Sequence, residues 1–151
     1  MIDEENKIYI DGTGLVLGRL SSWVAQQIIH GNKVVVVNAQ DMIISGNKKS
    51  LTKSYLQDRS RATHTNPKRG PFFPRFPDRI LRRTVRGMIP WKTRSGKDAF
   101  RRLSAFIDIP DELVDQEFQT LPEAKRSLSN RYMTVGELAR SIGWQHNVNK
   151  D

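Results

Sequence analysis

A run of four consecutive valines constrains the fold of this chain more than any other feature. The run, Val34–Val37, lies between Lys33 and Asn38 and contains no alternating polar residues. Such a run suits a strand that is buried on both faces, as in a parallel sheet covered by helices. The valines therefore predict an α/β fold with a mostly parallel sheet.

The residues before the valines predict a strand, a turn and a helix. Lys7–Asp11 is a short β-prone segment, and Gly12-Thr13-Gly14 ends it. Apolar residues then follow at helical spacing, at Leu17, Leu20, Val24 and Ile28, until about Gly31. Strand, helix and buried strand together form a βαβ unit, which is the building block of a parallel sheet.

Further elements are expected along the rest of the chain. Short strands are predicted at Met42–Ile44 and at Ala105–Ile109. Helices are predicted from Lys48 to about Gln57, from an N-cap at Asp78 to an end between Gly87 and Pro90, and from Ser95 to Leu103. Residues 59–77 hold four of the seven prolines and are expected to be irregular.

The last predicted helix starts at a capping box, with Thr134 as N-cap and Glu137 three residues later. One side of it is apolar, with Val135, Leu138, Ala139 and Ile142, and it stops at Gly143. We expect residues 1–144 to form a single domain and residues 145–151 to be a flexible tail.

Positive charge is concentrated in the middle of the chain. The net charge is +9, with a pI near 10.2, from 25 basic and 16 acidic residues. Residues 48–102 contain 17 Lys and Arg against three acids, so the other residues hold eight basic and 13 acidic side chains. Like charges packed together repel, and this segregation therefore favours a polyanionic partner.

The segment Asp78–Ile89 separates apolar from basic residues on two halves of a helix. The apolar half holds Ile80, Leu81, Thr84, Val85 and Met88, and the basic half holds Arg79, Arg82, Arg83 and Arg86. A solvated helix face normally mixes both signs of charge, whereas here only Asp78 is nearby. Guanidinium groups can bind phosphate with two hydrogen bonds. We therefore favour a nucleic-acid-binding face.

The basic helix at Ser95–Leu103 repeats this scheme, with Phe100 and Leu103 facing inward. Trp91, between the two helices, can either stack on an exposed base or anchor the core. Residues 59–77 are either a flexible loop or an arm that becomes ordered against RNA. His64 lies in this arm and receives no catalytic role.

The predicted RNA-binding residues are the basic side chains of the middle segment: Lys48, Lys49, Lys53, Arg59, Arg61, Lys68, Arg69, Arg75, Arg79, Arg82, Arg83, Arg86, Lys92, Arg94, Lys97, Arg101 and Arg102.

Several classes of protein are disfavoured. The chain has no cysteine, which is compatible with a reducing cytosol, and its three histidines are scattered, so no metal or other cofactor is expected. No stretch approaches the roughly 20 apolar residues of a membrane span, and the acidic start does not resemble a signal peptide. No catalytic triad or carboxylate pair is recognisable, so we expect neither an enzyme nor a small-molecule substrate.

An incomplete dinucleotide-binding pattern leaves a nucleotide-dependent enzyme as one alternative. Gly12, Gly14 and Gly18 follow a strand, but the third glycine comes one residue late. Asn38 stands at the end of the next strand, where an acid is usual, and Asp41 lies beyond it. The glycines are better explained by a tight turn and by close packing of the helix on the sheet.

Two groups of sequence blocks resemble protein thirteen of the large ribosomal subunit. The first group is Asp11-Gly12 through Gly18-Arg19-Leu20-Ser21, then Val34–Ala39, then Ile44–Lys48. The second is Val85–Pro90 followed by Gly96–Phe100. The likeness runs from about Ile8 to Pro110. The bacterial pattern has a His-Thr-Gly motif after the tyrosine, but this chain has an arginine- and proline-rich loop after Tyr55 instead. In this respect it is similar to the archaeal and eukaryotic branch of the family, and its size fits the archaeal version.

The resemblance implies a three-layer α/β/α fold with a mostly parallel sheet of about four strands, to which the basic helices and the extended arm are added. It also implies a structural protein of the cytoplasmic ribosome that binds large-subunit ribosomal RNA early in assembly, beside neighbouring ribosomal proteins. The RNA-binding role carries over to Lys48, Lys49, Lys53 and the basic positions through Arg102. A free-standing nucleic-acid-binding regulator remains the leading alternative.

Overall fold

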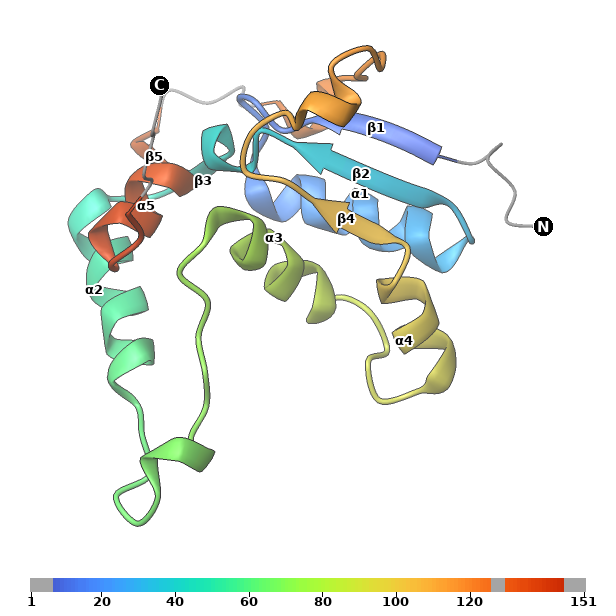
Figure 1. The fold of residues 1–151 in the computed structure, drawn as a ribbon. Coiled ribbons are helices and arrows are strands. Elements are labelled where there is room, and N and C mark those ends of the chain that lie inside the picture. Colours follow the sequence, from blue (N-terminus) through green and yellow to red (C-terminus); the bar gives the residue numbers. More distant parts are fainter. Residues whose placement is uncertain (1–6, 126–129, 146–151) are drawn as a thin grey trace.

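The computed structural model describes residues 7–125 and 130–145, and a parallel sheet lies at its centre (Figure 1). The sheet contains β1 (Lys7–Asp11), β2 (Lys33–Val37) and β4 (Leu103–Ala105), in the order β1-β2-β4, and both pairs are parallel. Val34, Val36 and Val37 of the central strand are fully buried, and Val35 is half-buried. The α/β class and the mostly parallel sheet are confirmed.

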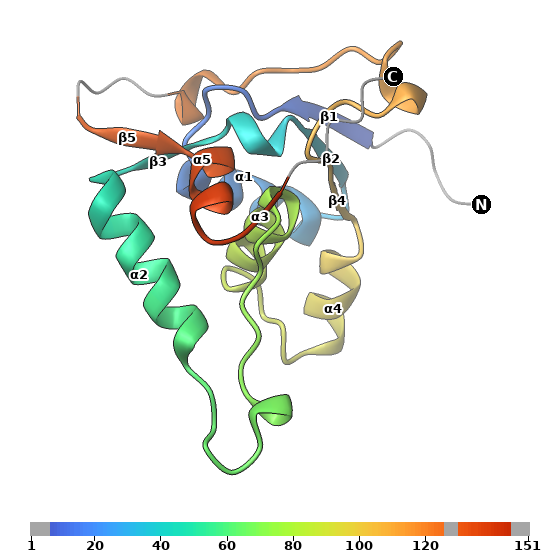
Figure 2. The same ribbon diagram turned by 60° about the vertical axis from the view of Figure 1, so that its left-hand side comes forward.

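Helices α1 (Leu17–Ile29) and α3 (Pro77–Arg86) pack side by side against one face of this sheet (Figure 2). The apolar stripe predicted for α1 is buried in the core. On the opposite face Tyr9 is half-buried and Ser104 is exposed. Phe118 packs edge-on against Tyr9, with 6.2 Å between the ring centroids. The segment that contains Phe118 is extended, and it covers the face of the sheet on which a helix is expected in an α/β/α fold.

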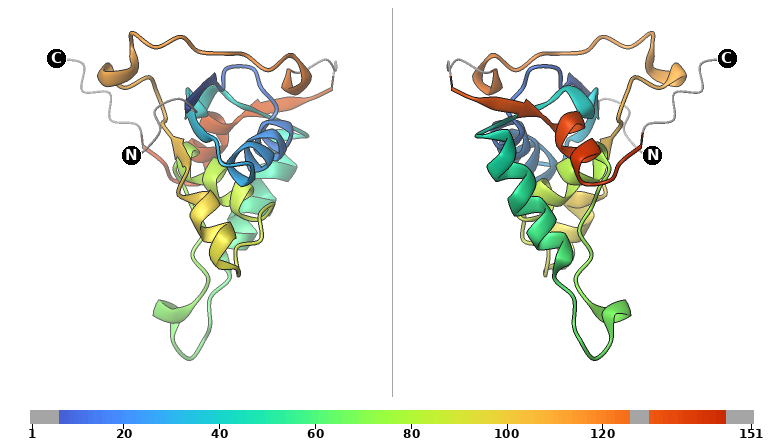
Figure 3. Two further views of the ribbon diagram at one scale, coloured as in Figure 1. Left: turned by 90° about the vertical axis from the view of Figure 1, so that its right-hand side faces the viewer. Right: turned by 90° about the vertical axis from the view of Figure 1, so that its left-hand side faces the viewer.

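Residues 106–124 lead from the end of β4, where the Phe106 amide donates to Val36 of β2, across the sheet to its edge beside β1 (Figure 3). Gln119 forms a parallel bridge with Ile10, and its backbone exchanges hydrogen bonds of 2.9 and 3.0 Å with Tyr9 and Asp11. The segment therefore lies where a fourth strand would pair with β1, but only Gln119 forms a bridge to that strand. It contains two short 3-10 helices, η4 (Asp111–Leu113) and η5 (Pro122–Ala124).

A second sheet pairs β3 (Ile43–Ser45) with β5 (Tyr132–Thr134), and these strands are antiparallel. A 3-10 helix, η2 (Ala39–Asp41), connects β2 to β3. Helix α5 (Val135–Ser141) begins at the predicted capping box: the Glu137 amide donates to Thr134 Oγ1 at 3.1 Å, and the Thr134 amide donates to the Glu137 carboxylate at 3.3 Å. The strand β5 carries no signal that we recognised in the sequence.

Helix α2 (Lys48–Ser60) projects away from the sheet and buries none of its residues. Residues 61–76, which we call the arm, return alongside it through η3 (Pro67–Arg69), and Figures 2 and 3 show the resulting hairpin. Helix α4 (Arg94–Phe100) lies on the other side of α3, capped by Thr93, whose hydroxyl oxygen accepts from the Gly96 amide at 3.1 Å.

Several predicted boundaries are wrong, and the strand expected at Met42–Ile44 lies one residue later, at Ile43–Ser45. Helix α2 extends three residues beyond Gln57. Helix α3 has Phe76 as N-cap, with Pro77 at its first position, so Asp78 lies in the first turn. Helix α4 ends before Leu103, because Leu103 pairs with Val34 as the first residue of β4. The strand expected at Ala105–Ile109 therefore lies at Leu103–Ala105.

Within residues 7–125 and 130–145, no helix combines the length and the apolar character that crossing a membrane requires. Apart from Gln145, the tail predicted at 145–151 lies outside the described residues.

Candidate nucleic-acid interface

Helix α3 buries one face in the core and presents arginine on the other. Ile80, Leu81 and Val85 are buried. Arg79, Arg82 and Arg83 are exposed and Arg86 is half-buried, as predicted from the helical periodicity. Met88, which we assigned to the buried side, is instead 44% exposed. The helix ends at Arg86, so helical periodicity no longer applies to Met88.

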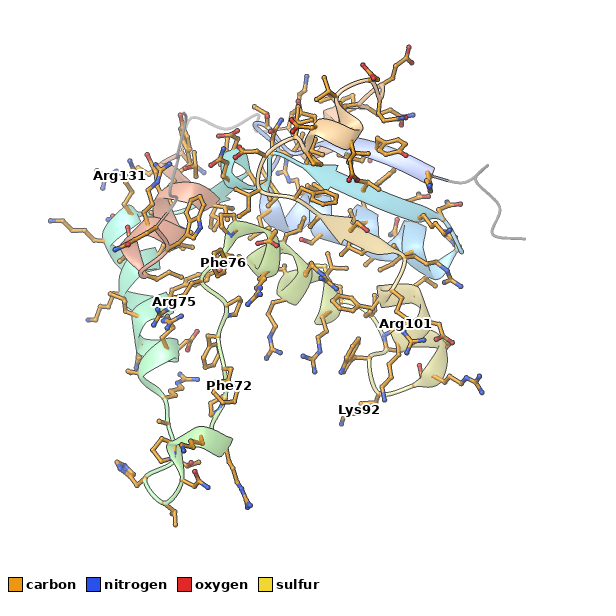
Figure 4. The ribbon with its side chains drawn as sticks, viewed as in Figure 1. Phe72, Arg75, Phe76, Lys92, Arg101 and Arg131 are labelled. Atoms are coloured by element: carbon orange, nitrogen blue, oxygen red, sulfur yellow. The ribbon has the colours of Figure 1, made fainter. Side chains whose placement is uncertain are left out.

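The arginine face lines two adjoining hollows, one between the arm and α4 and one beside the loop before α4, which together we call the basic groove. One hollow, of about 400 Å³, is lined by Phe72, Phe73, Pro74, Arg79, Arg82, Arg83, Arg86, Trp91 and Phe100. The other, of about 600 Å³, is lined by Arg83, Arg86, Gly87, Ile89, Pro90, Trp91, Lys92 and Thr93. Figure 4 shows Phe72 on the arm and Lys92 on the loop before α4, on opposite sides of α3.

Three of the four arginines lie over aromatic rings. The guanidinium carbon of Arg86 lies 4.4 Å from the ring centroid of Trp91, and that of Arg82 lies 5.1 Å from Phe100. Arg79 lies 5.2 Å from the ring of Phe76. Such contacts attract the cation to the ring face, and they limit the conformations that these long side chains adopt before a ligand binds.

The positive charge of α3 is not neutralised within the described part of the chain, where no carboxylate forms an ion pair with its four arginines. Three other predicted residues do have acidic partners: Lys48 with Glu137 at 3.3 Å, Arg61 with Asp58 at 3.4 Å, and Arg101 with Asp98 at 3.3 Å. All three pairs are exposed, where ion pairs contribute little to stability. The basic groove therefore keeps its charge available for an anion.

Two predicted RNA-binding residues hold the fold together. Arg102 donates a 2.9 Å hydrogen bond to the carbonyl of Ile28 in α1. Arg59 donates a 3.2 Å hydrogen bond to the carbonyl of Phe73, which attaches the arm to α2. Partial desolvation, together with the nearby charge of Arg75, lowers the pKa of Arg59. Both side chains have structural contacts that the charge map does not reveal.

The remaining predicted residues are exposed but spread over several elements, so the 17 side chains do not form one patch. Lys92 lines the basic groove. The others lie on α2, on the arm and on α4: Lys49, Lys53, Lys68, Arg69, Arg75, Arg94 and Lys97.

The predicted list of RNA-binding residues contains only Lys and Arg and none of the aromatic residues of this surface. Phe72, Phe73 and Phe100 line the basic groove beside the arginines. Trp91 packs against the core and also lines both hollows, so its core role is confirmed and base stacking stays a prediction. The interleaving of aromatic and basic residues between Phe72 and Phe100 was the available signal.

The amides of the glycine-containing loop after β1, residues 12–16, all donate within the protein, so the loop itself has none free for a pyrophosphate. Gly12, Gly14 and Val16 donate their amides to the carbonyls of Val37, Asp41 and Ala124, at 2.9, 3.2 and 2.8 Å. The other two amides of residues 12–16 donate to Asp11 Oδ1 and to the Gly12 carbonyl. This arrangement disfavours the nucleotide-enzyme alternative.

The same glycines are only partly explained by close packing. A Cβ at Gly12 would lie 3.0 Å from Met42 Cγ and from the carbonyl oxygen of Val37, and Gly14 has a φ of +74°. Gly18, in contrast, has nothing within 4 Å of its Cβ position, so the close helix–sheet packing that we expected there is wrong. Among the described residues no group of three His, Cys, Asp or Glu could hold a metal ion.

Comparison with known proteins identifies relatives that match most of the chain. Residues 5–112 match the family model described as ribosomal protein L13. The large ribosomal subunit protein uL13 of Archaeoglobus fulgidus is 42% identical over 139 residues, which cover 90% of this chain and 87% of the relative. The uL13 protein of Methanococcoides burtonii is 45% identical over 136 residues, covering 89% and 96%, and that of Methanopyrus kandleri is 40% identical over 148 residues, covering 95% and 91%. These relatives confirm the resemblance to archaeal proteins, and the chain belongs to the ribosomal protein L13 family.

Proposed function

We propose that this chain is a structural constituent of the large ribosomal subunit in the cytoplasm, and that it binds large-subunit ribosomal RNA through the basic groove. The family consists of structural proteins and not of enzymes. The observation that carries the RNA-binding role is the set of four arginines on α3, which line a concave surface without acidic partners among the described residues. In this proposal residues 1–144 act as one domain.

The physical mechanism is neutralisation of phosphate. Where RNA strands approach one another closely, repulsion between phosphates opposes compaction, and the basic groove lowers this repulsion. Arginine forks would position the protein on the backbone, while RNA shape and unpaired bases would supply specificity. Because compaction precedes the addition of later proteins, we infer that binding occurs early in assembly and needs no other ribosomal protein.

Footprinting on large-subunit RNA with the purified full-length protein tests both parts. Discrete protections are expected with the wild-type chain alone, and they should disappear when Arg79, Arg82, Arg83 and Arg86 are changed to Gln. A matched control removes four cations outside the basic groove: Lys7, Arg19, Lys33 and Arg140. Losing four phosphate contacts should reduce the slope of log affinity against log salt by about 3, at roughly 0.7–0.9 per phosphate. Weak binding to any polyanion, equal in both variants, would contradict the proposal and favour a free-standing regulator.

A further inference from the structure

We propose that the basic groove contains a site for one unpaired nucleotide of the bound RNA, in the hollow bordered by Phe72, Trp91 and Phe100. This inference rests on the proposed RNA binding and specifies which part of the RNA enters the protein. An unpaired base offers a ring face for stacking next to an anionic phosphate, and the hollow combines aromatic rings with guanidinium groups.

One wall of the site alternates rings with cations. Trp91 and Phe100 meet edge to face, with 5.0 Å between their centroids and an angle of 82°. Arg86 lies over Trp91 and Arg82 lies over Phe100. A base that enters here can stack on a ring or on a guanidinium plane, while its phosphate accepts hydrogen bonds from the same arginines.

The opposite wall is the arm, where Phe72 is 76% exposed. A single exposed apolar residue is common on protein surfaces and would mean nothing alone. Here the ring lines an open hollow of about 400 Å³ that it shares with three further rings, those of Phe73, Trp91 and Phe100. A base between the walls would remove the Phe72 ring from water.

Trp91 is held in place before any ligand binds. It lies in a turn in which the amide and the hydroxyl of Thr93 both donate to the Pro90 carbonyl, at 3.0 and 2.8 Å. The Thr93 hydroxyl oxygen also accepts from the Gly96 amide of α4 at 3.1 Å. The turn and α4 thus form one unit, which reduces the entropy lost when a base stacks.

An unpaired nucleotide fits this site better than a base pair does. In an A-form duplex the bases are stacked on one another and the major groove is deep and narrow, so protein rings reach few base faces. Bases in loops and bulges are accessible on both faces. The site therefore predicts contact with a loop, a bulge or a strand end.

The test compares Phe72→Leu and Trp91→Leu with the wild-type full-length chain, by filter binding to large-subunit RNA over a range of salt concentrations. Phe106→Leu, at a 38% exposed phenylalanine outside the basic groove, is the matched control. Each site variant should weaken binding by about 5- to 150-fold, the effect of losing one stacked base. The salt slope should not change, because neither variant removes a cation. Phe106→Leu should bind like the wild type.

The outcomes separate the two proposals. If the wild-type chain shows no salt-dependent binding to this RNA, the proposed function is overturned and the nucleotide site with it. If the wild type binds and Phe72→Leu binds equally well, the nucleotide site alone is overturned. Trp91→Leu could also disturb the core, so a loss seen only in that variant, together with a lower melting temperature, counts against the site. Base-specific chemical probing should show one unpaired nucleotide that the wild type protects and Phe72→Leu leaves reactive.

Discussion

The basic groove and the segment 106–124 lie on different sides of the parallel sheet and carry opposite charge. Figure 1 shows the segment above the sheet and the elements of the groove below it. Residues 48–102 hold 17 basic side chains, whereas residues 106–124 hold six acidic ones and no Lys or Arg. One chain thus presents two surfaces that would respond to RNA in opposite ways.

The two regions also differ in how their backbones are fixed. The acidic segment is attached to β1 by the hydrogen bonds of Gln119, and it accepts a 2.8 Å bond from Val16 at Ala124. In the arm, by comparison, Asn66 organises a turn: its backbone carbonyl accepts a hydrogen bond from the Thr63 hydroxyl, and its side chain accepts one from the Lys68 amide. From α2, the Arg59 guanidinium donates a hydrogen bond to the Phe73 carbonyl of the arm. Both regions lack long helices, but the sheet fixes only the acidic one. Under the proposed function, RNA supplies the contacts that the arm lacks.

The largest effect is expected from reversing the charge of the groove. Changing Arg79, Arg82, Arg83 and Arg86 to Glu removes four charge-assisted interactions of about 1.5–3 kcal/mol each. Affinity for large-subunit RNA should fall by at least about 10⁴-fold, which corresponds to roughly 6 kcal/mol. Binding is measured at 150 mM salt by filter binding. Reversing Lys7, Arg19, Lys33 and Arg140 changes the net charge equally, so an equal loss there would mean that overall charge, and not the groove, decides binding.

The next largest effect concerns the contact that attaches α4 to the turn containing Trp91. At Gly96 a Cβ atom would overlap the carbonyl oxygen of Pro90. Gly96→Ala should lower stability by roughly 1–3 kcal/mol, as overpacking against a backbone atom does. The melting temperature should fall by about 2–12 °C in thermal unfolding.

Gly18→Ala is the control for this prediction, because Gly18 is helical and has open space at its Cβ position. It should raise stability by up to about 1 kcal/mol, since alanine favours helix more than glycine does. Equal effects of the two substitutions would show that the Gly96 contact does not hold α4 in place.

Local patterns account for the part of the fold that was predicted well. The valine run and the apolar spacing of α1 are properties of neighbouring residues, and they located β1, α1 and β2 to within about two residues. The capping box of α5 is likewise local, and both of its hydrogen bonds are present.

The errors occur where a partner distant in sequence decides the structure. Leu103 fits the apolar side of a helix, but it forms a strand because Val34 pairs with it. The bridge between Gln119 and Ile10 and the strand β5 depend on similar long-range partners. No periodicity within the segments themselves reveals these pairings.

The charge map located the arginines of the candidate site but not its rings. Arg82 and Arg86 followed from helical spacing, whereas the contact of Phe100 with Trp91 depends on how the turn before α4 folds back. In the same way, the position of Phe72 across from these rings depends on the path of the arm. Charge is visible in a sequence as composition, but a shared hollow is not.

A smaller effect is expected from reversing the charge of the acidic segment. Asp111→Lys, Glu112→Lys and Asp115→Lys together create a second basic surface on exposed residues. Affinity for unrelated RNA should rise by roughly fivefold, about 1 kcal/mol, because exposed ion pairs are weak. The footprint on large-subunit RNA should stay where the wild type has it. If these changes abolish the specific footprint instead, the acidic segment also contacts the ribosomal RNA, and RNA binding is not confined to the basic groove.

The smallest effect tests whether acidic groups on this side repel one another in the free protein. Burial, together with the carboxylates of Asp108 and Asp11, raises the pKa of Asp41 above its ordinary value. Burial acts on Asp11 too, but hydrogen bonds from Asn38 and Thr13 outweigh it and lower the pKa of Asp11. Of the two, only Asp41 has a folded environment that disfavours its charged form.

Asp41→Asn should therefore stabilise the protein near neutral pH, by no more than about 0.5 kcal/mol, or about 1–2 °C in melting temperature. The sign follows from linkage: a raised pKa in the folded state penalises the wild type where Asp41 is ionised, above its folded pKa. The penalty disappears as the pH falls below the ordinary pKa of the carboxyl, so the melting curves of the two proteins should converge in acid. Melting temperatures between pH 3 and pH 8 measure this. A gain that stays constant over that range would show that Asn improves packing or hydrogen bonding, and that charge repulsion at Asp41 is not its cause.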